Sequence, residues 1–198
     1  MKTLFPIVII IFYTNVSFGD WSGDVASIHA ELERLTDNGS GLEDVERLRR
    51  YYRLSYDLAV LESPEFATSL GDPRSQDRLT DLSEAGVERR RAAQRKSLAL
   101  IRAIDRTALP EAERVNYDLL LDSLELGVRA QRFPEQYLQM NQMSGPQSDL
   151  ASLLAMMPKA RPEQLENQIA RMKALPAYID QSIALNGPKV MRPKPVKM

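Results

Sequence analysis

Residues 42–64 read LEDVERLRRYYRLSYDLAVLESP, and their apolar side chains recur at intervals of three and four residues. That interval is the period of one face of an α-helix and differs from the alternation of a strand. The residues expected on the buried face of this helix are Leu42, Val45, Leu48, Tyr52, Tyr56 and Ala59. Ser63 precedes Pro64, and a residue before proline is pushed out of the α-helical region, so the helix should end there.

The segment before this stretch has the same period. Residues 20–37 carry one apolar stripe that ends at Asn38-Gly39, a pair that favours the end of a helix. The residues of the stripe are Val25, Ile28, Leu32 and Leu35. A second amphipathic helix is therefore expected to precede residues 42–63.

A short helix is expected directly after residue 63. Proline suits the first position of a helix, and serine is a favoured cap, so Pro64 and Ser63 fit its start. Phe66 and Leu70 are expected to face the core, and Gly71 to end the helix.

Two longer helices should follow, the first capped by Ser83 and the second opened by Pro110-Glu111. The residues expected to face inward are Val87, Gln94, Leu98, Ile101 and Ile104 in the first helix, and Val115, Leu119, Leu120, Leu124 and Val128 in the second. The charged run 88–91, ERRR, is expected to be a solvated face.

Helical period resumes after Pro146, and a last helix is expected from Pro162. Its apolar residues keep a four-three spacing across Pro176, which should kink it: Leu165, Ile169, Met172, Ile179 and Ile183. No alternating strand pattern of useful length occurs. The sequence therefore predicts an all-α fold, an irregular bundle of about six to eight helices.

Residues 1–19 have the pattern of a secretory signal peptide. Met1-Lys2 is a short cationic start, and the apolar run 4–13 is shorter than the roughly 20 residues of a membrane-spanning helix. Small residues at Ser17 and Gly19 place the expected cleavage before Asp20. The expected location is periplasmic or secreted, with an uncleaved anchor or a buried helix as the alternative.

Composition excludes several kinds of site. The chain has one histidine and no cysteine, so it lacks the ligands of an ordinary zinc site and the thiol of a disulfide or a lipoprotein anchor. Its 26 basic and 27 acidic residues nearly balance, whereas a nucleic-acid partner would require a basic stripe. We therefore expect no cofactor in this chain, no nucleic-acid partner, and no membrane contact after cleavage.

The mature chain is expected to hold one helical domain over residues 20–187. Residues 188–198 are basic and rich in proline, a composition typical of an extended linker. We expect this tail to be a linker cut short.

Residues 133–146 interrupt the helical pattern and hold the best candidate binding site. Amide side chains beside a glycine turn offer several hydrogen-bond donors and acceptors, and loops on rigid helices often carry binding groups. The candidate substrate-binding residues are Asn141, Gln142, Ser144 and Gly145. The alternative is that these amides join two helices and have only a structural role.

Three other groups are weaker candidates. They are His29 with Glu33 as an acid–base pair, Asp118 with Asp122 and Glu125 as a cation site, and Asp72 with Arg74 as an anion anchor. The roles that we expect instead are a surface histidine, a solvated helix face and an ion pair that fixes a turn.

Five stretches, in this order, resemble a known family. They are ESPEFATSLGDPR at 62–74, RAIDR at 102–106, NYDLL at 116–120, NQMSGP at 141–146 and LPAYIDQ at 175–181. They resemble the N-terminal part of the bacterial family called domain of unknown function 885. The resemblance covers about residues 45–196, most of the mature chain.

The resemblance implies a secreted or membrane-anchored helical protein of the zinc metallopeptidase superfamily. It also implies that the metal-binding histidine and glutamate motif lies in a C-terminal half. This chain has no His-Glu-x-x-His motif, so no catalytic or metal-binding residue carries over. We expect a truncated gene, a frameshifted reading or a fragment.

Two functional hypotheses follow. The first is the N-terminal helical wall of a substrate cleft in a metallopeptidase-like protein, acting on a peptide-like substrate and catalytically inert alone. The second is a free-standing periplasmic binding or scaffolding protein. The first also predicts an exposed apolar face on residues 165–183, which would favour self-association.

Overall fold

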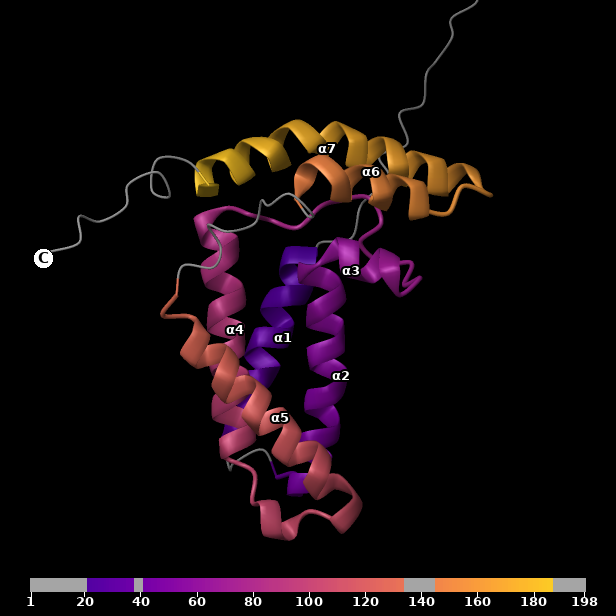
Figure 1. Cartoon of the computed structure of the whole chain (residues 1–198). Helices are drawn as coiled ribbons and strands as arrows, with labels where there is room; N and C mark the ends of the chain where they lie inside the picture. The colour runs from indigo at the N-terminus through magenta and orange to yellow at the C-terminus, as the bar shows by residue number, and fades with distance from the viewer. Residues whose placement is uncertain (1–20, 38–40, 134–144, 187–198) are drawn as a thin grey trace, which may run out of the picture.

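The computed structural model describes residues 21–37, 41–133 and 145–186, and all regular secondary structure within them is helical (Figure 1). The α-helices are α1 (Trp21–Thr36), α2 (Asp44–Glu62), α3 (Pro64–Ser69), α4 (Glu84–Arg102), α5 (Glu111–Ala130), α6 (Pro146–Met156) and α7 (Pro162–Asn186). A short 3-10 turn, η2 (Arg106–Ala108), precedes α5. The predicted all-α fold is confirmed.

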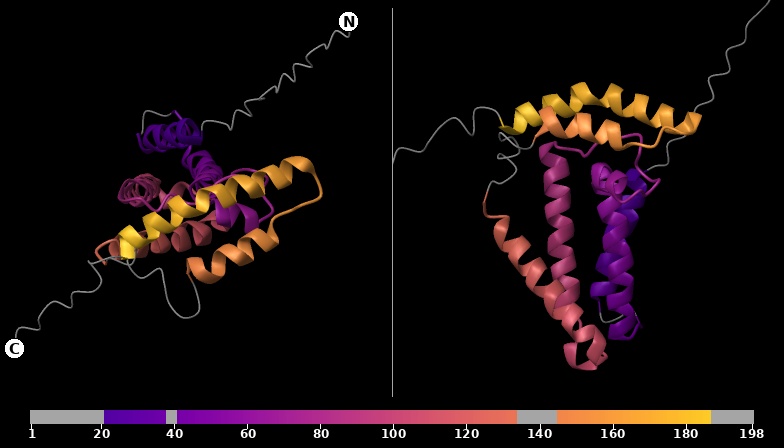
Figure 2. Two further views of the ribbon diagram at one scale, coloured as in Figure 1. Left: turned by 90° about the horizontal axis from the view of Figure 1, so that it is seen from above. Right: turned by 45° about the vertical axis from the view of Figure 1, so that its right-hand side comes forward.

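The helices form a bundle with a separate layer across one end. Helices α1, α2, α4 and α5 run along the bundle, and α6 and α7 lie side by side across its end (Figures 1 and 2). Within the bundle, α4 packs against both α1 and α5, and α1 packs against α2. Helix α3 contacts α2 and α6, so it connects the bundle with the end layer.

The main apolar core belongs to the bundle alone. Its fully buried residues include Leu32 and Leu35 of α1, Leu48 of α2, and Leu100 and Ile101 of α4. The predicted stripe of α1 is confirmed, because all four of its residues are buried. No described residue of α6 or α7 belongs to this cluster, so the end layer needs other contacts to hold it in place.

Several residues predicted to face the core are exposed. They are Tyr56, Phe66, Leu70, Val115 and Leu119, between 45% and 66% exposed. The physical reason is that periodicity finds an apolar stripe without showing which part is covered. Helix α3 is too short to bury more than Pro64, Ala67 and Thr68, and the main helix neighbour of α5 is α4, so only one flank of α5 is covered.

The starts of two helices agree with the prediction from local sequence. The hydroxyl oxygen of Ser83 accepts a hydrogen bond from the backbone N–H of Gly86 at 3.1 Å, which caps α4. Helix α5 begins after Pro110 with two acidic residues in its first turn. Ser63 occupies the cap position of α3 but makes no side-chain cap bond. Helix α7 continues through Pro176 as a single helix, gently bowed in Figure 1.

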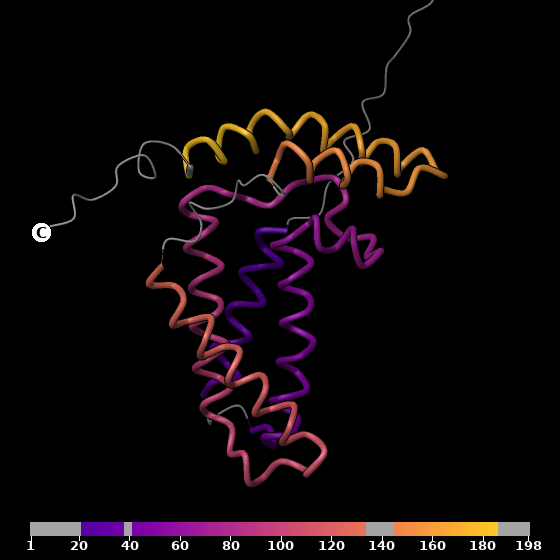
Figure 3. The backbone as a smooth tube through the Cα atoms, in the orientation of Figure 1, coloured from indigo at the N-terminus to yellow at the C-terminus, as the bar shows by residue number. Residues whose placement is uncertain are grey.

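Arg171 fastens the end layer to the bundle. Its side chain is fully buried, and its guanidinium donates to the carbonyl oxygens of Arg78 at 2.9 Å, Pro64 at 2.9 Å and Ser75 at 3.0 Å. It also donates to the hydroxyl of Thr68 at 2.7 Å. These partners lie on α3 and on the 70–82 segment, which runs beneath α7 across the end of the bundle (Figure 3). Arg171 therefore fixes α7 against both.

The predicted exposed face of α7 is present. Leu165, Ile169, Met172, Ile179 and Ile183 are each between 41% and 62% exposed. The opposite face carries Arg171, Ser182 and Leu185, which are buried. Within the described residues, no helix has the length and apolar character needed to cross a membrane.

Asp72 forms the ion pair that was expected to fix the turn after α3. Its carboxylate accepts from the side chain of Arg74 at 2.9 and 3.0 Å and from the hydroxyl of Tyr56 at 2.9 Å. The guanidinium of Arg74 also lies 5.5 Å from the ring centroid of Tyr56 and reaches Asp57 at 2.7 Å. The hydrogen bonds from Arg74 lower the pKa of Asp72 to about 2. Tyr56 therefore stabilises this turn and does not belong to the apolar core.

This ion pair predicts a specific loss of stability in acid. Because the pKa of Asp72 is lower in the folded chain than the ordinary value of 3.8, its contribution is complete above pH 4 and is lost as the pH falls toward 2. Asp72→Asn should lower the free energy of unfolding by about 1–2 kcal/mol at pH 6, after allowance for the exposed guanidinium. More than half of that difference should vanish by about pH 2.5.

Urea denaturation of both proteins across this range measures the difference. Asp180→Asn is the control, because Asp180 is exposed and its carboxylate has no hydrogen-bond partner among the described residues. A difference between wild type and Asp72→Asn that stays constant from pH 6 to pH 2.5 would contradict the assignment.

Candidate functional site

A groove of about 690 Å³ lies between α2, α4 and α5. Its volume is in the range of small-molecule and peptide pockets. Leu58 and Ala59 of α2, Val87 of α4 and Leu124 of α5 give it apolar walls. Phe133, the last described residue before 134–144, also lines it.

Polar side chains lie at intervals along the groove. Tyr51 is buried and its hydroxyl is hydrogen-bonded to Ser97, while burial raises the pKa of Tyr51. Further along, the side-chain N–H of Gln131 donates to the Gln94 side chain at 2.8 Å and to the carbonyl of Arg91 at 3.2 Å. The groove thus combines an apolar surface with a pair of side-chain amides that are hydrogen-bonded to each other.

Gly127 allows the amide of Gln94 to lie close to α5. A Cβ atom at position 127 would lie 2.0 Å from the side-chain nitrogen of Gln94. A larger residue there would therefore displace that amide from its place in the groove. This contact carries no signal in the sequence, because Gln94 and Gly127 lie on different helices.

Glu62 places a buried negative charge at one end of the groove. Its side chain is 5% exposed and accepts from Arg89 at 2.6 and 3.1 Å, with Arg90 at 3.6 Å. Burial of a carboxylate is costly unless it is paired, and two guanidinium groups satisfy this one. The prediction that residues 88–91 form a solvated face was therefore wrong for Arg89 and Arg90.

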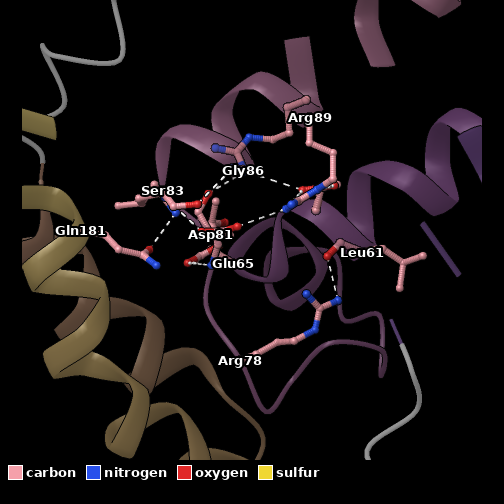
Figure 4. A network of polar contacts seen from close by, with 12 residues as sticks. Leu61, Glu65, Arg78, Asp81, Ser83, Gly86, Arg89 and Gln181 are labelled. Carbon is pink, nitrogen blue, oxygen red and sulfur yellow. Dashed lines mark hydrogen bonds and ion pairs between the residues drawn. The ribbon is translucent and has the colours of Figure 1, made fainter. Parts of the chain in front are cut away.

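Asp81 joins the same network from the segment before α4 (Figure 4). Its carboxylate accepts from the backbone N–H of Ser83 at 3.0 Å and from Arg89 at 3.4 Å, and its carbonyl accepts from Arg90 at 2.7 Å. The side-chain oxygen of Gln181 accepts from the backbone N–H of Leu82 at 2.9 Å. The network thus extends from the Glu62 end of the groove to α7.

The predicted binding loop lies mostly outside the described residues, which exclude Asn141, Gln142 and Ser144. Gly145 is described, and it has a φ of 140°, a conformation that favours glycine. Its backbone N–H donates to the carboxylate of Asp149 at 2.8 Å at the start of α6. The substrate-binding role of these four residues stays a prediction.

His29 does not pair with Glu33. Its Nδ1 atom lies 3.5 Å from the ammonium of Lys96, and Glu33 instead binds Lys96 at 2.8 Å. His29 is also half-buried, and its Nε2 atom is buried without a hydrogen-bond partner within the described part of the chain. Burial and the nearby Lys96 lower the pKa of His29. Because the ring is half-buried, the expectation of a surface histidine was only partly correct.

Two of the three acidic residues considered for a cation site, Asp118 and Glu125, are engaged in ion pairs on the surface. Asp118 binds Arg106 at 2.6 Å, and Glu125 binds Arg102 at 2.9 Å. No group of three or more histidine, cysteine, aspartate or glutamate side chains suited to a metal occurs in residues 21–37, 41–133 and 145–186. The described residues therefore offer no set of ligands that fits a zinc ion.

The fold and the groove define an all-helical protein with an inter-helical groove. The sequence profile of the family described as "Bacterial protein of unknown function (DUF885)" matches residues 64–193, and the chain belongs to this family. The family predicted from the five stretches is thereby confirmed. Searches of curated proteins and of solved structures gave no match.

Removing the negative charge at the end of the groove should destabilise the fold. Glu62→Gln leaves Arg89 and Arg90 without their buried carboxylate, so we expect the free energy of unfolding to fall by about 2–3 kcal/mol. Glu88→Gln is the matched control, because Glu88 is 60% exposed and its ion pair with Arg95 should contribute less than about 1 kcal/mol. Chemical denaturation measures both, and equal effects would contradict the buried role of Glu62.

Proposed function

We propose that this chain forms the helical wall of a substrate cleft in a metallopeptidase-like protein and does not itself hold the metal. The observation that carries the proposal is the groove between α2, α4 and α5, with its apolar walls and its amide pair. An extended peptide needs both surfaces, because its side chains are often apolar while its backbone needs hydrogen-bond partners.

The position of Phe133 supports the same proposal. Phe133 lines the groove and is followed in the chain by residues 134–144, which include Asn141 and Gln142. We propose that this segment adds the predicted amide donors and acceptors to the groove. Our proposal thus joins the described groove and the predicted binding residues in one peptide-binding surface.

The remaining parts of the proposal concern location and activity. The apolar run near the N-terminus supports export to the periplasm or the medium, with cleavage before Asp20. The single histidine and the absence of cysteine support a chain that is inert without a separate metal-binding part. We expect the exposed face of α7 to favour self-association of the chain alone.

A groove-filling variant tests the proposal on the full chain. Ser55 lines the groove, and among the described residues its hydroxyl bonds only the carbonyl of Tyr52, at 2.9 Å. Ser55→Trp should therefore fill the groove and retain the fold. We expect labelled oxidised insulin B chain to bind the wild type and to bind Ser55→Trp at least about tenfold more weakly. Fluorescence anisotropy measures the binding.

Ser27→Trp is the matched control. Ser27 is also a helical serine whose hydroxyl bonds the carbonyl three residues earlier, at 2.7 Å, but it lies on the exposed side of α1. Ser27→Trp should bind the peptide like the wild type. Equal binding by all three proteins, or no binding by the wild type, would reject the proposal that the groove binds a peptide. Zinc-dependent cleavage by the chain, abolished by a chelator, would reject the proposal that it is catalytically inert alone.

A further inference from the structure

A second hollow, of about 570 Å³, lies between the turn after α3 and the connection from α6 to α7. It shares no lining residue with the groove between α2, α4 and α5. The hydrogen bonds of Arg171 to α3 and to the 70–82 segment hold its two sides together, and its partner Thr68 is itself a lining residue. The hollow is therefore built into the fold.

The apolar part of this hollow consists of prolines and methionines. Pro73 lines one side, and Met156, Met157 and Pro158 line the other. Met157 is almost fully buried and gives the hollow a fixed floor, whereas Met156 is 56% exposed. Methionine side chains are flexible and polarisable, so they adapt to apolar ligands of different shape.

Arg161 supplies an unpaired positive charge beside this apolar surface. Its guanidinium lines the hollow and has no hydrogen bond or ion pair within the described part of the chain. Asp72 also lines the hollow, but its carboxylate is already neutralised by Arg74. Glu163 lines the hollow as well, so the site carries one free charge of each sign.

Asn167 offers an amide one helical turn further along α7. Its side chain lines the hollow and makes no hydrogen bond to another described residue. The neighbouring Gln164 is different, because its side-chain oxygen accepts from the backbone N–H groups of Ala160 and Arg161 and stabilises the start of α7. Asn167 is therefore the amide of this pair that is free to bind a ligand.

We propose that this hollow binds the apolar C-terminal end of a short peptide. Arg161 would bind the terminal carboxylate, because a guanidinium matches the two oxygens of a carboxylate. Asn167 would bind the adjacent peptide group, and Met156 and Met157 would contact the apolar side chain. The site is distinct from the groove and does not depend on a metal.

Small carboxylates of known structure test this proposal on the full chain. Isothermal titration should detect N-acetyl-L-leucine, and N-acetyl-L-leucinamide, which lacks the carboxylate, should bind at least about tenfold more weakly. Arg161→Gln should abolish this preference, whereas Lys159→Gln, a matched change at an exposed residue that does not line the hollow, should keep it. Glu163→Gln should strengthen binding of the acid, because it removes a nearby negative charge.

Binding of octanoate tests whether the hollow prefers the end of a peptide or a fatty acid. Octanoate carries the carboxylate and an apolar chain but no peptide group. Asn167→Ala should therefore weaken the binding of N-acetyl-L-leucine and leave the binding of octanoate unchanged. Ser55→Trp, a change in the groove, should leave the binding of both compounds to the hollow unchanged. This test is therefore independent of the groove. Tighter binding of octanoate than of N-acetyl-L-leucine, equal binding of acid and amide, or no binding by a correctly folded wild type would overturn the proposal.

Discussion

The guanidinium of Arg171 is the contact on which the arrangement of the two layers depends. The apolar core joins α1, α2, α4 and α5 and includes no described residue of α6 or α7. Arg171 is fully buried and bonds three carbonyl groups and one hydroxyl, with no carboxylate among these partners. Burial lowers its pKa, but a guanidinium stays charged far above neutral pH. Four well-placed acceptors therefore take the place of water around a buried charge.

Both candidate sites depend on this polar connection. The hollow beside Met157 has one side on α3 and the following turn and the other on α6 and α7, so it exists only while α7 is fixed. The groove lies in the bundle, but the network around Glu62 and Asp81 continues through Leu82 to Gln181 of α7. Movement of the end layer would therefore disturb one site directly and the other through its polar end.

The sequence predicted the features that depend on neighbours along the chain. The stripe of α1, the cap at Ser83 and the start of α5 follow from local spacing and helix-capping chemistry, and all three are present. The exposed apolar face of α7 was also predicted, as a consequence of the first functional hypothesis.

The features that the sequence missed depend on contacts between distant segments. Arg171 stands among ordinary helix residues, and its acceptors are backbone carbonyls, which carry no sequence signal. Arg89 and Arg90 look like a solvated run until Glu62 and Asp81 are placed beside them. Tyr56 has core spacing, yet it serves the ion pair of Asp72. Of the candidate binding residues, only Gly145 is described, and its N–H bonds Asp149.

The central claim is that a buried arginine, and not the apolar core, holds α6 and α7 on the bundle. Native-state hydrogen exchange of wild type and Arg171→Met tests it most directly, because methionine fills similar space and leaves the four acceptors without a donor. We expect the backbone amides of α7 and of residues 75–82 to lose protection, while those around Leu100 and Ile101 keep theirs. Unchanged protection throughout, or an equal loss in both layers, would contradict the account.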